Sequence, residues 1–443
     1  MKKWILLLAM GTIITSLTAC ASEESSTSAK VKSKDGRTVL TLSVTESNPF
    51  YQTVEKKFEE KYPEIDLQIN AYKTGEQWGQ GEFEKYRNSM NTAMLSGKSM
   101  DIIEIDSLPL KEYVSKGFLL NMNDLLKQDQ TLDKNDLQMN ILNGLKMNDG
   151  MYTIPLGYML RVFVGDEAML NKADAQFDDK TWNWKEFEKV SKEVIQKENG
   201  QDKIYALASY PPELLFQEML YENYAAFVDP SAQKATFDSP EFVNMLEQVK
   251  QMYQDKIVTS EESKRGNQIF SSTPITSPID FIEGPYMLFD QPKLLQSPQA
   301  GENGNRKGSR ISIMAQFAIH AKSPVKDEAW KFINFLLSEE VQMLQDREGF
   351  SMLKSVNEKK IEELHEKVKN GEYKLSSGEM AKVPDEQFTV FKQVVQSADQ
   401  YVDLDVKVLG IAGEESLAFF GGQKTAEEVA KLIQNRVTTY LNE

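Results

Sequence analysis

The stretch TVLTLSVTESNPFYQTVEKKFEEKYPEIDLQINAY, residues 38–72, decides the fold of this chain. Its two ends are short, β-rich runs of largely apolar residues, which is typical of strands. Between them, large apolar residues are spaced for one face of a helix, and Pro63 predicts its end. A second predicted helix at 83–97 and a third predicted strand at 100–106 follow. The alternation of strands with helices predicts a parallel α/β sheet.

Later segments continue with helices that carry recognisable caps. Ser239 precedes Pro240 and an apolar stripe, and residues 323–338 begin with the same Ser-Pro pair. The helix predicted at 425–441 opens with the capping box formed by Thr425 and Glu428. The folded part from Thr38 onward has about 400 residues, which is too many for one hydrophobic core. We therefore expect at least two lobes.

The N-terminus reads as a processing segment. Residues 1–19 have a positive start and an apolar run that is too short to span a bilayer, as in a secretory signal peptide. The sequence LTAC that ends at Cys20 resembles a bacterial lipobox, so we expect lipidation of Cys20. The alternative is an ordinary signal peptide with an incidental cysteine. Residues 20–37 have too few large apolar side chains to form a core and predict a flexible tether.

The charge balance excludes some partners. The chain has 51 Lys and Arg against 67 Asp and Glu, a formal net charge of −16. Nucleic acid is a poor partner for such a surface, because binding phosphates needs clustered cations. Anionic lipid headgroups would also repel it, so we expect the lipid to hold the protein at the membrane.

Motifs for catalysis, metals and cofactors are scarce. The two histidines, His320 and His365, lie in no zinc or triad motif, and no phosphate-binding loop or nucleophile elbow occurs. We expect no cofactor and no metal. A pair of carboxylates for glycoside hydrolysis stays open, because the separation of two carboxylates cannot be read from a sequence.

Aromatic residues in predicted loops are the most informative feature. Trp78, Tyr158, Tyr210 and Tyr286 each lie near Gly or Pro. Proteins hold sugars with flat rings that stack on the pyranose, together with polar groups that bind the hydroxyls. Each ring taken alone is more often part of a core.

Ordered blocks along nearly all of residues 38–443 resemble one family, the extracellular solute-binding proteins of bacterial ABC importers, in the maltose-binding-like branch. The blocks are FEEKYPEIDLQI, NTAMLSGKSMDIIEID, KMNDGMYTIPLG, TWNWKEFEKV, FIEGPYML, FAIHAKSPVKDEAWKFINFLLSEEVQ and GGQKTAEEVAKLIQNRV. Their shared order, rather than any single block, carries the resemblance.

The resemblance implies an α/β, two-lobed, periplasmic-binding-protein-like class II fold with crossing hinge strands and a C-terminal helical region. The N-terminal lobe would take residues 38–156 and about 311–345, and the C-terminal lobe residues 157–310 and about 346–443. A carbohydrate, expected to be an oligosaccharide, would bind in the cleft between the lobes. A monomeric, membrane-anchored receptor would then deliver it to the transmembrane subunits of an ABC permease.

The resemblance implies a set of candidate ligand contacts in this sequence. Some are chosen because they follow a predicted strand, and others because an aromatic or polar residue matches the family's residue in the same block. The set is Glu46, Asn48, Trp78, Asp106, Tyr158, Arg161, Tyr210, Glu283, Tyr286 and Phe388, with Phe391 an equal candidate to Phe388. Tyr286 in EGPY stands where maltose-binding members have a stacking Trp. Ile105 stands where those members have an aromatic, so maltodextrin is not the default ligand.

Two further questions stay open from the sequence. Arg161 could bind the carboxylate of an acidic sugar, or it could pair with a carboxylate of the protein, which we favour. The rivals to a transport receptor are a secreted lipoprotein enzyme that acts on glycans through an Asp/Glu pair, and a ligand sensor that retained the fold.

Overall fold

The computed structural model describes residues 30–73, 81–106, 108–198, 203–229, 232–299, 310–398, 400–401 and 404–442. The expected signal peptide, the expected lipidation site Cys20 and the candidate Trp78 lie outside the described residues. The strands are β1 (Thr38–Glu46), β2 (Ile65–Lys73), β3 (Ile102–Glu104), β4 (Ile154–Asp166), β5 (Val228–Asp229), β6 (Lys234–Ala235), β7 (Phe270–Ile275), β8 (Pro292–Leu295), β9 (Arg310–Ile319), β10 (Phe350–Ser351) and β11 (Gln400–Tyr401).

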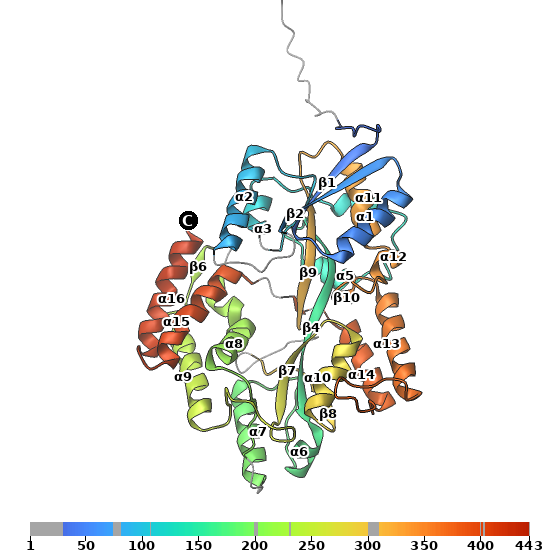
Figure 1. Ribbon diagram of the computed structural model, residues 1–443. Helices are drawn as coiled ribbons and strands as arrows, with labels where there is room; N and C mark the ends of the chain where they lie inside the picture. The colour runs from blue at the N-terminus through green and yellow to red at the C-terminus, as the bar shows by residue number, and fades with distance from the viewer. Residues whose placement is uncertain are drawn as a thin grey trace, which may run out of the picture.

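The helices surround these strands in Figure 1. They are α1 (Pro49–Lys61), α2 (Glu82–Ser96), α3 (Leu110–Ser115), α4 (Asn123–Gln128), α5 (Met139–Gly144), α6 (Glu167–Lys172), α7 (Trp184–Lys197), α8 (Pro212–Phe227), α9 (Pro240–Gln254), α10 (Pro278–Leu288), α11 (Lys326–Leu336), α12 (Glu339–Gln342), α13 (Lys354–Lys369), α14 (Asp385–Gln396), α15 (Val406–Phe420) and α16 (Ala426–Leu441).

The N-terminal part has the alternation that the sequence predicts. β1 pairs in parallel with β2 on one side and with β3 on the other. The side chain of Asn48 caps α1 by accepting a hydrogen bond from the backbone N–H of Tyr51, and α1 ends two residues before Pro63. Thr425 and Glu428 form the predicted capping box of α16. The mixed α/β fold class is confirmed.

Two long antiparallel strands join the upper and lower parts of the molecule in Figure 1. β9 pairs with β3 above, and β4 pairs with β7 and β8 below. The main path of the sheet runs β10-β4-β9-β3-β1-β2. The lobe boundary expected at residues 156 and 157 falls inside β4, so the two halves share continuous strands.

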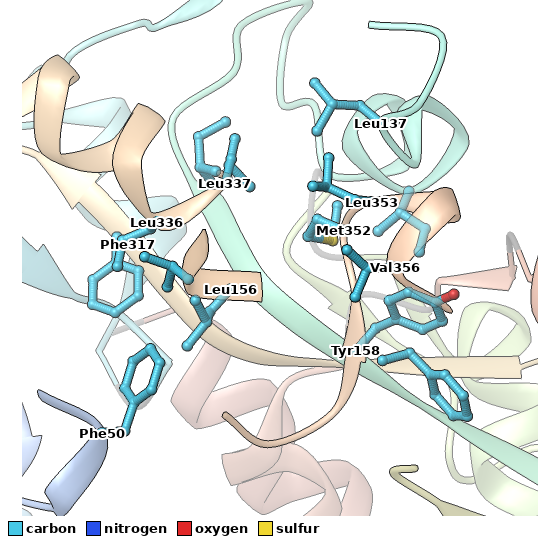
Figure 2. Close-up of a cluster of buried hydrophobic side chains, with 14 of the residues drawn as sticks. Phe50, Leu137, Leu156, Tyr158, Phe317, Leu336, Leu337, Met352, Leu353 and Val356 are labelled. Atoms are coloured by element: carbon cyan, nitrogen blue, oxygen red, sulfur yellow. The ribbon is translucent and has the colours of Figure 1, made fainter. Parts of the chain in front are cut away.

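Among the described residues, buried apolar side chains form one large core cluster and two smaller ones. The large cluster, which we call the continuous core, extends from β1 and α1 through the even-numbered residues of β4 to α10, α13 and α14. Figure 2 shows its middle, where Leu156 and Tyr158 of β4 lie among side chains from α11 to α13. The upper cluster contains residues of α2, α3 and β3, and the lower cluster residues of α7, α8, α9, α15 and α16.

Candidate ligand-binding site

One face of the β4–β9 pair is left partly uncovered between the upper and lower clusters. Directly opposite residues of an antiparallel pair point to the same face. On this face Ala318 belongs to the upper cluster and Phe163 to the lower cluster. Between them four residues are only half-buried, and we call them the open strand face: Met159, Arg161, Ser312 and Met314.

The other face of the same strands has no such interruption along β4. Leu156, Tyr158, Leu160, Val162 and Val164 are all buried in the continuous core. Apolar packing therefore ties the two halves together on one side, while a half-exposed stretch separates two packed clusters on the other.

A network of opposite charges lies at the lower end of the open strand face. Nη1 of Arg161 is 3.0 Å from Oε1 of Glu218 in α8. Arg310 stands opposite Arg161 in the strand register, and its Nη1 lies 3.3 Å from Oε2 of Glu218 and 2.9 Å from Oε1 of Glu222. The Arg310 guanidinium also covers the ring of Tyr221 at 3.8 Å. Glu218 thus bridges the two arginines.

Tyr210 lies beside this network. Burial raises the pKa of its hydroxyl to about 12, and the charge of Glu218 acts in the same direction. Arg161 also donates from Nη1 to the hydroxyl of Ser272 in β7 at 3.5 Å. Arg161 and Tyr210 are therefore two sequence-predicted residues that the structure brings together.

Asp106 lies at the upper end, just past β3. Its Oδ2 accepts a hydrogen bond of 2.9 Å from the backbone N–H of Gln316 in β9. Desolvation raises the pKa of Asp106 to about 7, and the negative charge of Glu104 adds to the effect. The side chain nevertheless reaches solvent. Asp106 is thus an exposed residue whose carboxyl group is partly shielded from water.

The two ends of the site are well separated along the strands. Arg310 and Gln316 are six residues apart on β9, which corresponds to roughly 20 Å of extended chain. This span exceeds the width of one hexose ring, and hydrogen-bonding groups are present at both ends. The arrangement can bind an extended, polar ligand.

Several sequence-predicted contacts belong to the core in this structure, which corrects the expectation that they offer surface to a ligand. Tyr158 has no exposed surface, and its hydroxyl is 3.1 Å from Nε2 of Gln138. Tyr286 of α10 is 6 % exposed and packs edge-on against Phe281. Phe388 is 1 % exposed and stacks on the His365 ring at 4.4 Å.

The remaining candidates have mixed surroundings. Glu283 accepts hydrogen bonds from Tyr373 and Ser376, which outweigh desolvation and lower its pKa. Phe391, the equal candidate to Phe388, is buried and stacks on Phe281 at 4.2 Å, so it too belongs to the continuous core. Glu46 is exposed at the end of β1, and Asn48 is exposed but caps α1.

Sequence reasoning missed the residues that build the lower end of the site. Glu218 and Glu222 are four residues apart on the apolar helix α8, so they share one face. Two carboxylates on one side of a buried helix are the signal that could have identified them, because buried charges need partners. The exposed rings of Tyr72 and Phe83, which flank Tyr86 at 5.0 and 6.3 Å, were also missed.

The described residues contain neither a candidate metal site nor a helix that could span a membrane. Among them, no group of three or more His, Cys, Asp or Glu side chains is arranged to hold a metal ion. None of the described helices is long and apolar enough to cross a membrane.

Comparison with known proteins identifies the class of protein. Residues 43–343 match the family model of the bacterial extracellular solute-binding proteins, and the chain belongs to this family. The family binds solutes outside the cytoplasm, and its members include sugar-binding components of ABC transporters. The resemblance inferred from the ordered blocks is thereby confirmed.

Solved structures show the same two-lobed fold. A family 1 extracellular solute-binding protein from Alicyclobacillus acidocaldarius is 17% identical, with a TM-score of 0.60 over 92% of this chain and 99% of that chain. An ABC substrate-binding protein from Listeria monocytogenes in complex with cycloalternan is 16% identical, with a TM-score of 0.58 over 92% and 99%. A periplasmic oligogalacturonide binding protein from Yersinia enterocolitica is 18% identical, with a TM-score of 0.60 over 91% and 99%.

Proposed function

We propose that this protein is the lipid-anchored receptor of an ABC importer and binds an oligosaccharide across the open strand face. The proposal rests on how side chains pack on that face. The upper and lower clusters are separated by a half-exposed stretch, and polar groups lie at both ends of this stretch. The carbohydrates named for the Listeria and Yersinia proteins support the ligand class.

The mechanism is binding without a chemical step. Asp106 would hold hydroxyls from the upper side, while Arg161 and Tyr210 would hold them from the lower side. A ligand that contacts both sides favours the arrangement in which they approach each other, because it binds that arrangement more tightly. The continuous core on the opposite face acts as the hinge. The lobe boundaries given above remain part of this proposal.

Glu46 and Asn48 complete the proposed site at the upper end, and Trp78 stays a candidate from the sequence because it lies outside the described residues. Glu46 and Asn48 follow β1, whose carboxyl end lies beside that of β3. The exposed rings of Tyr72 and Phe83 offer flat surfaces on which sugar rings can stack. These assignments give the upper side both hydroxyl-binding and stacking groups.

A thermal-shift screen of residues 30–443 against neutral, acidic and cationic oligosaccharides tests the ligand class. A bound ligand stabilises the folded state by RT ln(1 + [L]/Kd), so a tight ligand raises the melting temperature clearly. No stabilisation by any carbohydrate would refute the ligand class.

The rival function, cleavage of a glycan, is favoured by one feature only. Asp106, with its raised pKa, lies near Glu104, and a carboxyl group that retains a proton near neutral pH can act as a general acid. Recovery of the stabilising oligosaccharide intact after prolonged incubation would support the receptor. Cleavage that is abolished in Asp106→Asn would support the enzyme.

Anchoring at the membrane is tested separately. Replacing Cys20 by Ser removes the thiol to which the diacylglycerol would be attached. The variant should leave the membrane fraction and appear in the medium or periplasm of an expressing cell. If it remained with the membranes, Cys20 would not be the anchor.

A further inference from the structure

At the lower end of the open strand face, positively and negatively charged side chains neutralise each other. Arg161 and Arg310 are the cations, and Glu218 and Glu222 are the anions. The side chains of Arg310 and Glu222 are 5 % and 2 % exposed, so that pair is fixed in the interior. Arg161 and Glu218 are more accessible, at 25 % and 16 %.

At the upper end of the open strand face the carboxylate is that of Asp106, and the nearby guanidinium of Arg347, beside Gly157, already donates to three backbone carbonyls through its Nη atoms. Glu104 stands opposite Phe317 in the strand register, on the face of the continuous core, where it accepts hydrogen bonds from the backbone of Thr45 and the hydroxyl of Tyr51. A ligand carboxylate would therefore face the carboxyl group of Asp106 above and an already neutralised arginine below. Like-charge contacts in a desolvated site strongly disfavour binding.

We infer that Glu218 makes this receptor selective for uncharged oligosaccharides by occupying the guanidinium of Arg161. The inference rests on the proposed function and deepens it. The ion pair uses Nη1 of Arg161, and a guanidinium has further N–H groups that can donate to sugar hydroxyls. Glu218 also holds the guanidinium in place, so a neutral ligand meets a preorganised donor.

Substitution of Glu218 tests the selectivity, because Glu218 can be neutralised while Arg310 keeps its ion pair with Glu222. In Glu218→Gln, Arg310 keeps its partner Glu222, and only Arg161 is released. A released, accessible arginine binds carboxylates in a bidentate manner. The variant should therefore gain affinity for an acidic oligosaccharide and lose affinity for a neutral one.

The experiment measures binding of galactotetraose, cellotetraose, maltotetraose and tetragalacturonate by isothermal titration calorimetry. The wild type should bind at least one neutral tetramer and show weaker binding of tetragalacturonate. Glu218→Gln should shift the ratio of the two affinities toward tetragalacturonate by roughly tenfold or more. The double variant Arg161→Gln/Glu218→Gln should lose this gain, which ties the effect to Arg161.

The control is Glu414→Gln, which removes a carboxylate paired with Arg436 on the exposed side of α15. It should leave both affinities unchanged, and circular dichroism should show that every variant is folded. Tighter binding of tetragalacturonate than of the neutral tetramers by the wild type would overturn the inference. So would an unchanged affinity ratio in a folded Glu218→Gln. Failure of the wild type to bind any carbohydrate would refute the proposed function instead.

Discussion

At the scale of single residues, Asp106 shows how desolvation changes an ordinary carboxyl group. Its pKa is about 7 in the folded chain, against an ordinary value of 3.8. Between these two values the folded state binds more protons than the unfolded state does. The free energy of unfolding therefore falls as the pH rises from about 4 to about 7, and the loss is complete above the folded pKa.

Replacing Asp106 by Asn should remove this loss. The melting temperature of the variant minus that of the wild type should be larger at pH 8 than at pH 4.5, because only the wild type carries the desolvated charge at pH 8. Differential scanning calorimetry at the two pH values measures it. The matched control, Asp124→Asn, changes an exposed carboxyl group and should show no such difference. If the difference in melting temperature between the variant and the wild type were the same at both pH values, the raised pKa of Asp106 would be contradicted.

Substitution of Tyr286 tests whether this residue belongs to the hydrophobic core or to the ligand-binding site. The ring is 6 % exposed and packs against Phe281 in the continuous core. Tyr286→Ala should therefore lower the free energy of unfolding by about 3 kcal/mol, as other large-to-small core changes do. Chemical denaturation measures this. If the variant were as stable as the wild type but had lost affinity for carbohydrate, Tyr286 would belong to the binding site and not to the core.

At the scale of elements, Gln342 joins four segments near the middle of the sheet. Its Nε2 donates to the carbonyls of Leu156 in β4 and Leu336 in α11. Its Oε1 accepts from the hydroxyl of Ser351 and the backbone N–H of Met352, at β10. The side chain is fully buried, so all of these hydrogen bonds are sheltered from water.

Gln342→Met keeps the length of the side chain but removes every one of these bonds. Buried backbone groups would then lack partners, and we expect a loss of about 3 kcal/mol in the free energy of unfolding. Urea denaturation measures the loss, with Gln128→Met at an exposed helix end as the control. A loss as small as that of the control would show that the network does not hold these elements together.

The elements themselves could largely be predicted from the sequence, because local patterns encode them. The alternation of β1, α1 and β2 and the capping box at Thr425 are both present as expected. Which side chains are accessible could not be predicted in the same way. Tyr158 and Tyr286 resemble ligand contacts in sequence, yet helices distant in the chain cover them. Glu218 and Arg310 meet across 92 residues, and no local pattern records such a pairing.

At the scale of the whole molecule, the two faces of the β4–β9 pair have different roles in this account. One face carries the continuous core and joins the halves, and Figure 2 shows the part of this core beside β4. The other face leaves the open strand face between two clusters. The family-derived candidates Glu283, Tyr286 and Phe388 pack around α10, α13 and α14, where the continuous core is formed.

Hydrogen–deuterium exchange with and without a stabilising oligosaccharide tests this assignment most directly. Ligand binding across the open strand face should add protection in the segments 159–161 and 310–316 and in α8 around Glu218, with little change in α13 and α14. Protection confined to residues 354–396 and α10, with none along β9, would instead place the ligand on the opposite face of the sheet.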